Sequence, residues 1–123
     1  MAGAAQGADG GEARALLAEA RALRAAGRIA EAEQAERRSL AAATRDPRHR
    51  AVAEALAGGR TVEANQQLQA LIEADGEDVL ALTLFGSQAS KAREFALAED
   101  LLRRALALAP SEPNVRFAWA DHL

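Results

Sequence analysis

The chain has no cysteine, and aromatic residues make up only 3% of its 123 residues. Without cysteine it can form neither a disulfide nor a thiolate metal site, and it has no cysteine nucleophile. Runs of valine, isoleucine, threonine and aromatic residues, which favour strands, are also missing. Alanine instead makes up more than a quarter of the sequence, and alanine favours helix. The composition therefore predicts an all-α fold.

The sequence also lacks the marks of membrane insertion or secretion. No stretch approaches the roughly 18 unbroken apolar residues that a membrane span needs. Residues 1–11 have neither the positive start nor the apolar core of a secretory signal, and we expect them to be a disordered tail. The net charge of −3 argues against a nucleic-acid or anionic-membrane partner. Arginine greatly outnumbers lysine, which occurs only at Lys91, and this preference is typical of a GC-rich bacterial genome. We expect a soluble, cytoplasmic bacterial protein.

Residues 78–110 carry the strongest helical pattern in the chain. Apolar or small residues recur every three or four positions from Val79 to Ala89, and again from Phe95 to Leu106. Pro110 stops the second helix. Two short amphipathic helices cannot cover all of their apolar surface alone, so this hairpin requires neighbours.

The spacing of small and large residues in this hairpin resembles the tetratricopeptide repeat, a helical hairpin of about 34 residues. The family's small residue falls on Gly86, its two alanines on Ala98 and Ala105, and its closing proline on Pro110; Ala89 replaces the usual tyrosine. A glycine facing an alanine, Gly86 against Ala98, would let the two helices nearly touch. A generic helical hairpin is the alternative.

The resemblance implies a right-handed α-solenoid of six to seven helices arranged as antiparallel hairpins. The parallel between GRIAEAE, from Gly27, and GRTVEAN, from Gly59, supports an internal repeat. We expect four units after the tail: a degenerate or capping hairpin at 12–44, a repeat at 45–77, the best-matching repeat at 78–110, and a terminal helix at 111–123.

The terminal helix has two interpretations. It is either the solvating cap of the array or part of a hairpin in a longer protein of which this chain is a fragment. Its apolar side chains favour the fragment: Val115, Phe117, Trp119 and Leu123.

Several residues are expected to start or stop helices. Asp46 and Pro47 suit the start of a helix, and Thr61 and Ser111 are expected to cap the starts of two others. Gly27 and the Gly58-Gly59 pair are expected to end the helices that precede them.

Little in the sequence points to chemistry. The two histidines, His49 and His122, lack zinc-ligand spacing, and no serine has a histidine partner in a visible motif. We expect no catalytic residue, no metal ligand and no cofactor, and therefore no enzyme. The one basic cluster runs from Arg45 to Arg50; it could hold a phosphate or an acidic peptide, or be the solvated face of a helix.

In tetratricopeptide arrays the first helix of each hairpin lines a concave groove. Carried onto this chain, the resemblance implies a peptide-binding groove lined by His49, Arg50, Leu80, Thr83, Leu84, Ser87, Lys91, Phe117 and Asp121. The favoured function is a non-enzymatic scaffold that binds a peptide or helix of a protein partner there.

The sequence leaves two alternatives open. The chain could be the N-terminal repeat module of a larger bacterial enzyme, because AEDLLRRALALAP resembles repeat regions of sulfotransferase-like proteins. It could also self-associate into a homo-oligomer through Trp119 and Leu123 at the C-terminal edge.

Overall fold

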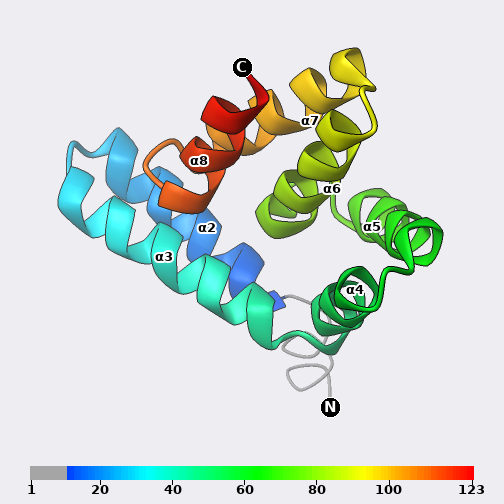
Figure 1. The fold of residues 1–123 in the computed structure, drawn as a ribbon. Helices are drawn as coiled ribbons and strands as arrows, with labels where there is room; N and C mark the ends of the chain where they lie inside the picture. Colours follow the sequence, from blue (N-terminus) through cyan, green and yellow to red (C-terminus); the bar gives the residue numbers. More distant parts are fainter. Residues whose placement is uncertain (1–10) are drawn as a thin grey trace.

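The computed structural model describes residues 11–123, and this part of the chain is all-α, as predicted (Figure 1). It contains seven helices: α2 (Gly11–Ala25), α3 (Ile29–Arg45), α4 (Pro47–Ala57), α5 (Thr61–Ala74), α6 (Val79–Lys91), α7 (Phe95–Leu108) and α8 (Pro113–His122). The expected disordered tail lies outside the described residues except for Gly11, which already belongs to α2.

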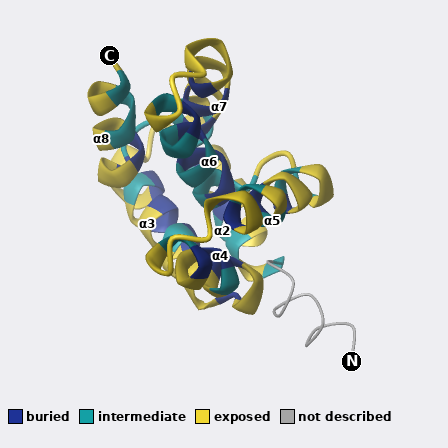
Figure 2. Cartoon of the chain, turned by 45° about the vertical axis from the view of Figure 1, so that its right-hand side comes forward, coloured by how far each residue is buried: buried dark blue, intermediate teal, exposed yellow. Residues whose placement is uncertain are grey.

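The helices pack mainly in sequential pairs. α2 pairs with α3, α4 with α5 and α6 with α7, while α8 packs on α6 and α7. The prediction that residues 78–110 form a pair of helices is therefore confirmed. Buried residues lie where neighbouring helices meet, and exposed residues lie on the outer sides of the helices and in the turns (Figure 2).

The same turn joins the two helices of each pair. Gly27, Gly59 and Arg93 all adopt left-handed backbone, with φ of 80°, 76° and 63°. In each turn the N–H of the next residue donates to the carbonyl five residues earlier, at 2.8–2.9 Å. These bonds satisfy carbonyls at the end of the first helix. Five residues after the left-handed one, the second helix carries an alanine with no exposed surface: Ala32, Ala64 and Ala98.

Acidic side chains cap the starts of α4, α6 and α8. Asp46 accepts from the N–H of Arg48 at 2.9 Å, as its position before Pro47 predicts, and Asp78 accepts from that of Ala81 at 3.0 Å. Glu112 caps α8. Acidic caps also complement the positive ends of the helix dipoles.

The two other predicted caps are wrong. Thr61 is the first residue of α5, and no side chain caps that helix. Ser111 precedes the true cap of α8, and its hydroxyl instead accepts from Arg24 at 3.3 Å. Both errors arose because any hydroxyl or carboxylate near a helix start is compatible with capping, and tertiary contacts decide which one is used.

The close approach of α6 and α7 differs in detail from the prediction. Gly86 is buried in their seam, but the atoms nearest to it belong to Leu102 and Leu101 rather than to Ala98. A β-carbon on Gly86 would lie 2.6 Å from Cγ and Cδ2 of Leu102. The glycine therefore makes room for a leucine, which needs more space than an alanine.

Two apolar clusters lie side by side along the pairs. The first is centred on Val52, Leu68 and Ala81 of α4, α5 and α6, and the second on Leu82, Leu101 and Val115 of α6, α7 and α8. Ile72 and Phe85 contact both clusters, so the two form one continuous core. Phe95, expected in the buried stripe of α7, is instead 55% exposed because it lies in the first turn of that helix.

The α2–α3 hairpin lies across the turns that lead into α6 and α8. From α2, Arg14 bonds Asp75 at 3.3 Å and Arg21 bonds Glu77 at 2.9 Å, both in the turn before α6. From α3, Glu36 accepts from Arg24 at 2.7 Å and from the N–H of Ser111, before α8, at 3.4 Å. The hairpin thus closes off the N-terminal ends of these helices.

Candidate functional site

A groove of about 570 Å³ lies between α3, α6 and α8. Seven of the nine predicted groove residues line it: Leu80, Thr83, Leu84, Ser87, Lys91, Phe117 and Asp121. The structure adds residues of α3 that sequence reasoning missed, Leu40 and Thr44. They were missed because α3 reaches this place through the packing of the first hairpin, which no local pattern reveals.

The groove is walled on three sides. α6 and α8 form its long walls, and α3 stands at their N-terminal ends, where Leu40 and Leu80 both line the groove. From Leu80 to Lys91 the wall of α6 runs for about 16 Å, since a helix rises 1.5 Å per residue. A bound segment would therefore lie along α6 and α8 and meet α3 at one end.

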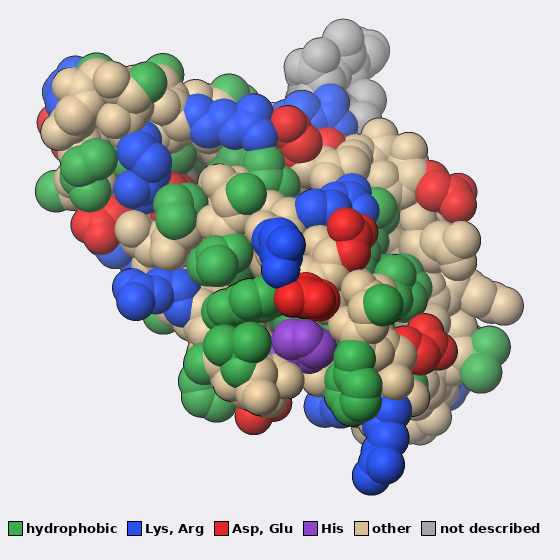
Figure 3. All heavy atoms as spheres, turned by 90° about the horizontal axis from the view of Figure 1, so that it is seen from above, with side chains coloured by type: hydrophobic (Ala, Val, Ile, Leu, Met, Phe, Trp, Pro, Cys, Tyr) green, Lys and Arg blue, Asp and Glu red, His purple; other side chains and the backbone are tan. Residues whose placement is uncertain are grey.

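The lining is apolar at its base, with small polar groups along it and charges toward one end. Leu80, Leu84 and Val115 supply apolar surface, and the charges come from Lys91 and Asp121. Phe117 is 75% exposed at the rim. Over the face shown in Figure 3, acidic and basic side chains are interspersed with hydrophobic ones. The groove lining itself carries one basic and one acidic side chain, Lys91 and Asp121, and therefore no field of one sign.

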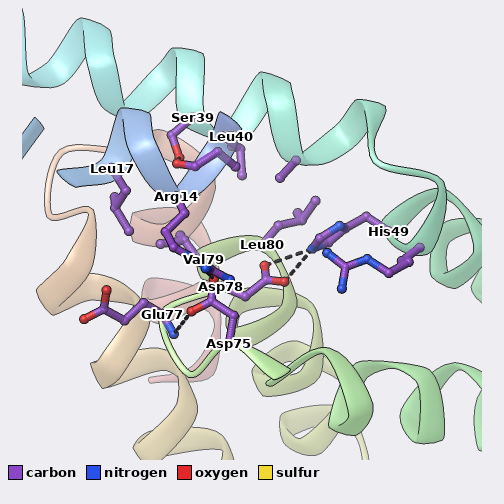
Figure 4. Close-up of a pocket in the computed structure, with 13 residues that line it drawn as sticks. Arg14, Leu17, Ser39, Leu40, His49, Asp75, Glu77, Asp78, Val79 and Leu80 are labelled. Atoms are coloured by element: carbon purple, nitrogen blue, oxygen red, sulfur yellow. Dashed lines mark hydrogen bonds and ion pairs between the residues drawn. The ribbon is translucent and has the colours of Figure 1, made fainter. Parts of the chain in front are cut away.

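His49 and Arg50 do not line the groove. Arg50 is exposed on α4, while the side chain of His49 is only 3% exposed and lies at the start of that helix. His49 Nε2 contacts both carboxylate oxygens of Asp78, at 2.7 and 2.9 Å (Figure 4). Its Nδ1 lies 3.5 Å from the carboxylate of Asp46. His49 therefore joins the capping residues of α4 and α6 and acts in holding two hairpins together.

The capping carboxyl of Asp46 has a shifted pKa. Burial would raise the pKa, but hydrogen bonds from the side chain and backbone of Arg48 oppose it, together with the charges of Arg48 and His49. The net effect lowers the pKa of Asp46 below its ordinary value of 3.8. This carboxyl is thus charged at neutral pH and stabilises the junction.

A cavity of about 30 Å³ adjoins this junction, between α2, α3 and the start of α6. Its volume is sufficient for about one water molecule. Ser39 lies beside it and donates to the carbonyl of Ala13 at 2.7 Å, which ties α3 to α2. The cavity therefore belongs to the packing of the first hairpin and is too small for a metabolite.

The basic cluster predicted at Arg45 to Arg50 is already partly engaged. Arg45 pairs with Glu12 at 3.4 Å, and Arg48 pairs with Asp46 at 2.9 Å. Its histidine is buried against Asp78. These contacts favour the structural interpretation of the cluster over an anion-binding one.

One serine has a histidine partner that no sequence motif indicates, because the two residues lie 32 positions apart. His122 Nδ1 lies 3.1 Å from Ser90 Oγ, and its ring packs beside those of Phe95 and Trp119, with centroids at 6.2 and 5.9 Å. Ser90 stands in the last turn of α6, where the backbone presents carbonyl oxygens rather than the N–H donors that stabilise an oxyanion. The pair fits a packing contact between α6 and α8 better than a nucleophile and its base.

No group of three or more histidine, cysteine, aspartate or glutamate side chains in residues 11–123 is arranged to hold a metal ion. None of the helices in that range is both long and apolar enough to cross a bilayer. Searches against protein-family models, curated proteins and solved structures gave no match. The function must therefore be inferred from the residues and geometry of the chain itself.

Proposed function

We propose that this chain is a non-enzymatic scaffold that binds a peptide or helix of a protein partner in the groove between α3, α6 and α8. The observation that carries the proposal is the groove itself: preformed, largely apolar and lined from three helices. A rigid groove binds well because the partner loses conformational freedom on binding while the scaffold loses little.

The size of the groove suits such a ligand. A wall of about 16 Å matches three turns of helix or about five residues of extended chain. Apolar anchors of the ligand would lie against Leu80, Leu84 and Val115, and its polar groups would meet the small polar side chains above them. The opposite charges of Lys91 and Asp121 at the open end would favour a ligand that carries charges there too.

The repeated turns support a tetratricopeptide-like architecture. Three helical pairs share one turn geometry and one buried alanine, and the first helices of the second and third pairs begin at acidic caps. In this proposal α4, α6 and α8 are successive first helices of a short right-handed solenoid, and the α2–α3 hairpin caps it.

The test is a pull-down that compares a groove variant with a control variant outside the groove. Phe117→Asp places a charge in the groove, and Lys91→Glu is added to reverse the charge at its open end. Leu123→Asp is the control, because Leu123 is 82% exposed and does not line the groove. We expect the groove variant to lose a partner that the wild type and the control retain, with unchanged helical circular dichroism. Capture of the same proteins by all three would refute the groove as the binding surface.

A further inference from the structure

The α2–α3 hairpin is attached to the rest of the protein differently from the other two pairs. Helices α4 to α8 share one continuous apolar core, but among residues 11–123 neither cluster of that core includes a residue of α2 or α3. α2 packs mainly on α3 and much less on the other helices. Apart from Leu17, the buried apolar residues of the hairpin are alanines, which bring little apolar surface to a junction. Other contacts must therefore keep the hairpin in place.

Two exposed ion pairs join the hairpin to the turn that leads into α6. Arg14 and Arg21 lie two turns apart on the same face of α2. Arg14 bonds Asp75 at 3.3 Å, and Arg21 bonds Glu77 at 2.9 Å. We call these two pairs the arginine latch. The two arginine side chains are 56% and 48% exposed, so water and dissolved ions reach both pairs.

The space behind the arginine latch is not completely filled. The cavity of about 30 Å³ lies there, between apolar side chains of the hairpin and of α6: Leu17, Leu40, Val79 and Leu80 (Figure 4). Protein interiors contain few voids that can hold a water molecule, so apolar contact across this junction is incomplete. Separating the hairpin from α6 therefore costs less than separating two closely packed helices.

The contact of the hairpin with the start of α8 is polar too. Arg24 donates to the hydroxyl of Ser111 at 3.3 Å, and the N–H of Ser111 donates to the carboxylate of Glu36 at 3.4 Å. Both bonds are longer than the typical value of about 2.9 Å. Water can replace such bonds when the hairpin moves away.

A single residue connects the hairpin to α4. α3 ends at Arg45 and α4 begins at Pro47, so only Asp46 lies between them, with extended backbone at φ −69° and ψ 126° (Figure 1). Pro47 has no N–H and cannot continue α3 into α4. Rotation at Asp46 would move the hairpin as one body, since its two helices pack on each other. α3 has 17 residues and extends about 25 Å from this hinge, so a small rotation gives a large displacement at its far end.

We infer that the α2–α3 hairpin is a movable wall of the groove, which the arginine latch holds closed. Leu40 and Thr44 of α3 line the groove, and they leave it when the hairpin rotates away. Closure of the hairpin and binding of a ligand then favour each other, because only the closed form offers three walls. This coupling rests on the proposed function of the groove, whereas the motion of the hairpin does not and is tested without a ligand.

Salt should shift the hairpin toward the open form. The Debye length falls from about 10 Å at 0.1 M salt to about 3 Å at 1 M, which weakens exposed ion pairs. Each exposed pair shifts an equilibrium by at most about fivefold. Loss of both latch pairs should therefore raise the ratio of open to closed molecules by roughly tenfold.

Spin-label distances measured by pulsed electron paramagnetic resonance test this motion. The chain has no cysteine of its own, so two introduced cysteines carry the labels. Ala30→Cys, near the start of α3, is combined with Ala96→Cys in α7, and both positions are exposed. We expect one main distance at low salt and a second population that grows by roughly tenfold at about 1 M sodium chloride. Ala53→Cys with Ala96→Cys, both outside the hairpin, is the control pair and should keep one distance.

A charge swap tests the arginine latch itself. Arg21→Glu should raise the open population at low salt at least fivefold, since it replaces an ion pair by two like charges. Adding Glu77→Arg restores the pair with its charges exchanged and should return the distances to those of the wild type. Arg103→Glu is the matched control, because it breaks an exposed pair within α7, and it should change nothing.

Two results would overturn the inference. One is a single unchanged distance at every salt concentration and in every variant. The other is a charge swap that fails to restore the closed form. Either result leaves the groove and its pull-down test unaffected, because no ligand takes part in these measurements.

Discussion

The packing of Gly86 predicts that alanine at this position destabilises the protein, against the usual rule for helices. Helix propensity alone would favour Gly86→Ala by about 1 kcal/mol. In the structure the added β-carbon would lie 2.6 Å from two atoms of Leu102, about 1 Å closer than carbon atoms normally pack. Leu102 has no exposed surface into which it could move.

The balance of the two effects gives the expected magnitude. Overpacking of a filled core costs about 1–3 kcal/mol. Because both clashing atoms belong to a fully buried side chain, we place the cost in the upper half of that range. After the gain in helix propensity, Gly86→Ala should lower the free energy of unfolding by about 1–2 kcal/mol.

Urea unfolding followed by circular dichroism measures this change. With a typical slope of about 1–2 kcal/mol per molar urea, the midpoint should fall by roughly 0.5–2 M. Gly58→Ala is the matched control. Its β-carbon would press on the mobile guanidinium end of Arg60, which can move, and would lie 3.4 Å from the carbonyl oxygen of Glu54, an ordinary contact distance, so its effect should stay within about 0.5 kcal/mol.

A second variant isolates the steric contact. Methionine is unbranched and adaptable, so in a Leu102→Met background the penalty of Gly86→Ala should shrink by about 1 kcal/mol. A Gly86→Ala protein more stable than the wild type would show that α6 and α7 do not approach as closely as the structure has them.

Three further predictions concern the turns, a buried ion pair and a helix cap. Arg93→Gly should stabilise the protein by about 0.5–1 kcal/mol in thermal unfolding, because it relieves left-handed backbone at φ 63°. Arg24→Ala should lower the free energy of unfolding, measured in urea, by about 2–4 kcal/mol, because it leaves the carboxylate of Glu36 buried without its charged partner. Loss of the exposed Arg103–Glu99 pair is the control and should lower it by less than about 0.5 kcal/mol. Asp46→Asn keeps a capping side chain but loses its charge. Because folding lowers the pKa of Asp46, the wild type should be more stable than this variant well above pH 3.8. This difference in stability should shrink as the pH falls below 3.8.

Local pattern was enough to predict most of the helices and their pairing. Helical periodicity located the hairpin at 78–110, and glycine marked the ends of helices at Gly27 and Gly59. The third turn escaped notice because Arg93 stands where the other two have glycine. Only backbone geometry shows that all three are the same turn, since an arginine in left-handed conformation has no sequence signature.

Contacts between distant segments could not be predicted in the same way. The repeat register placed His49 on the groove-facing side of its helix, but the first hairpin covers that end of α4, and His49 is buried against Asp78. Nothing near His49 in the sequence indicates this contact, because its partner is supplied by α6. The same packing brings Leu40 into the groove. Repeat registers predict which residues share a face, and tertiary packing decides whether that face stays open.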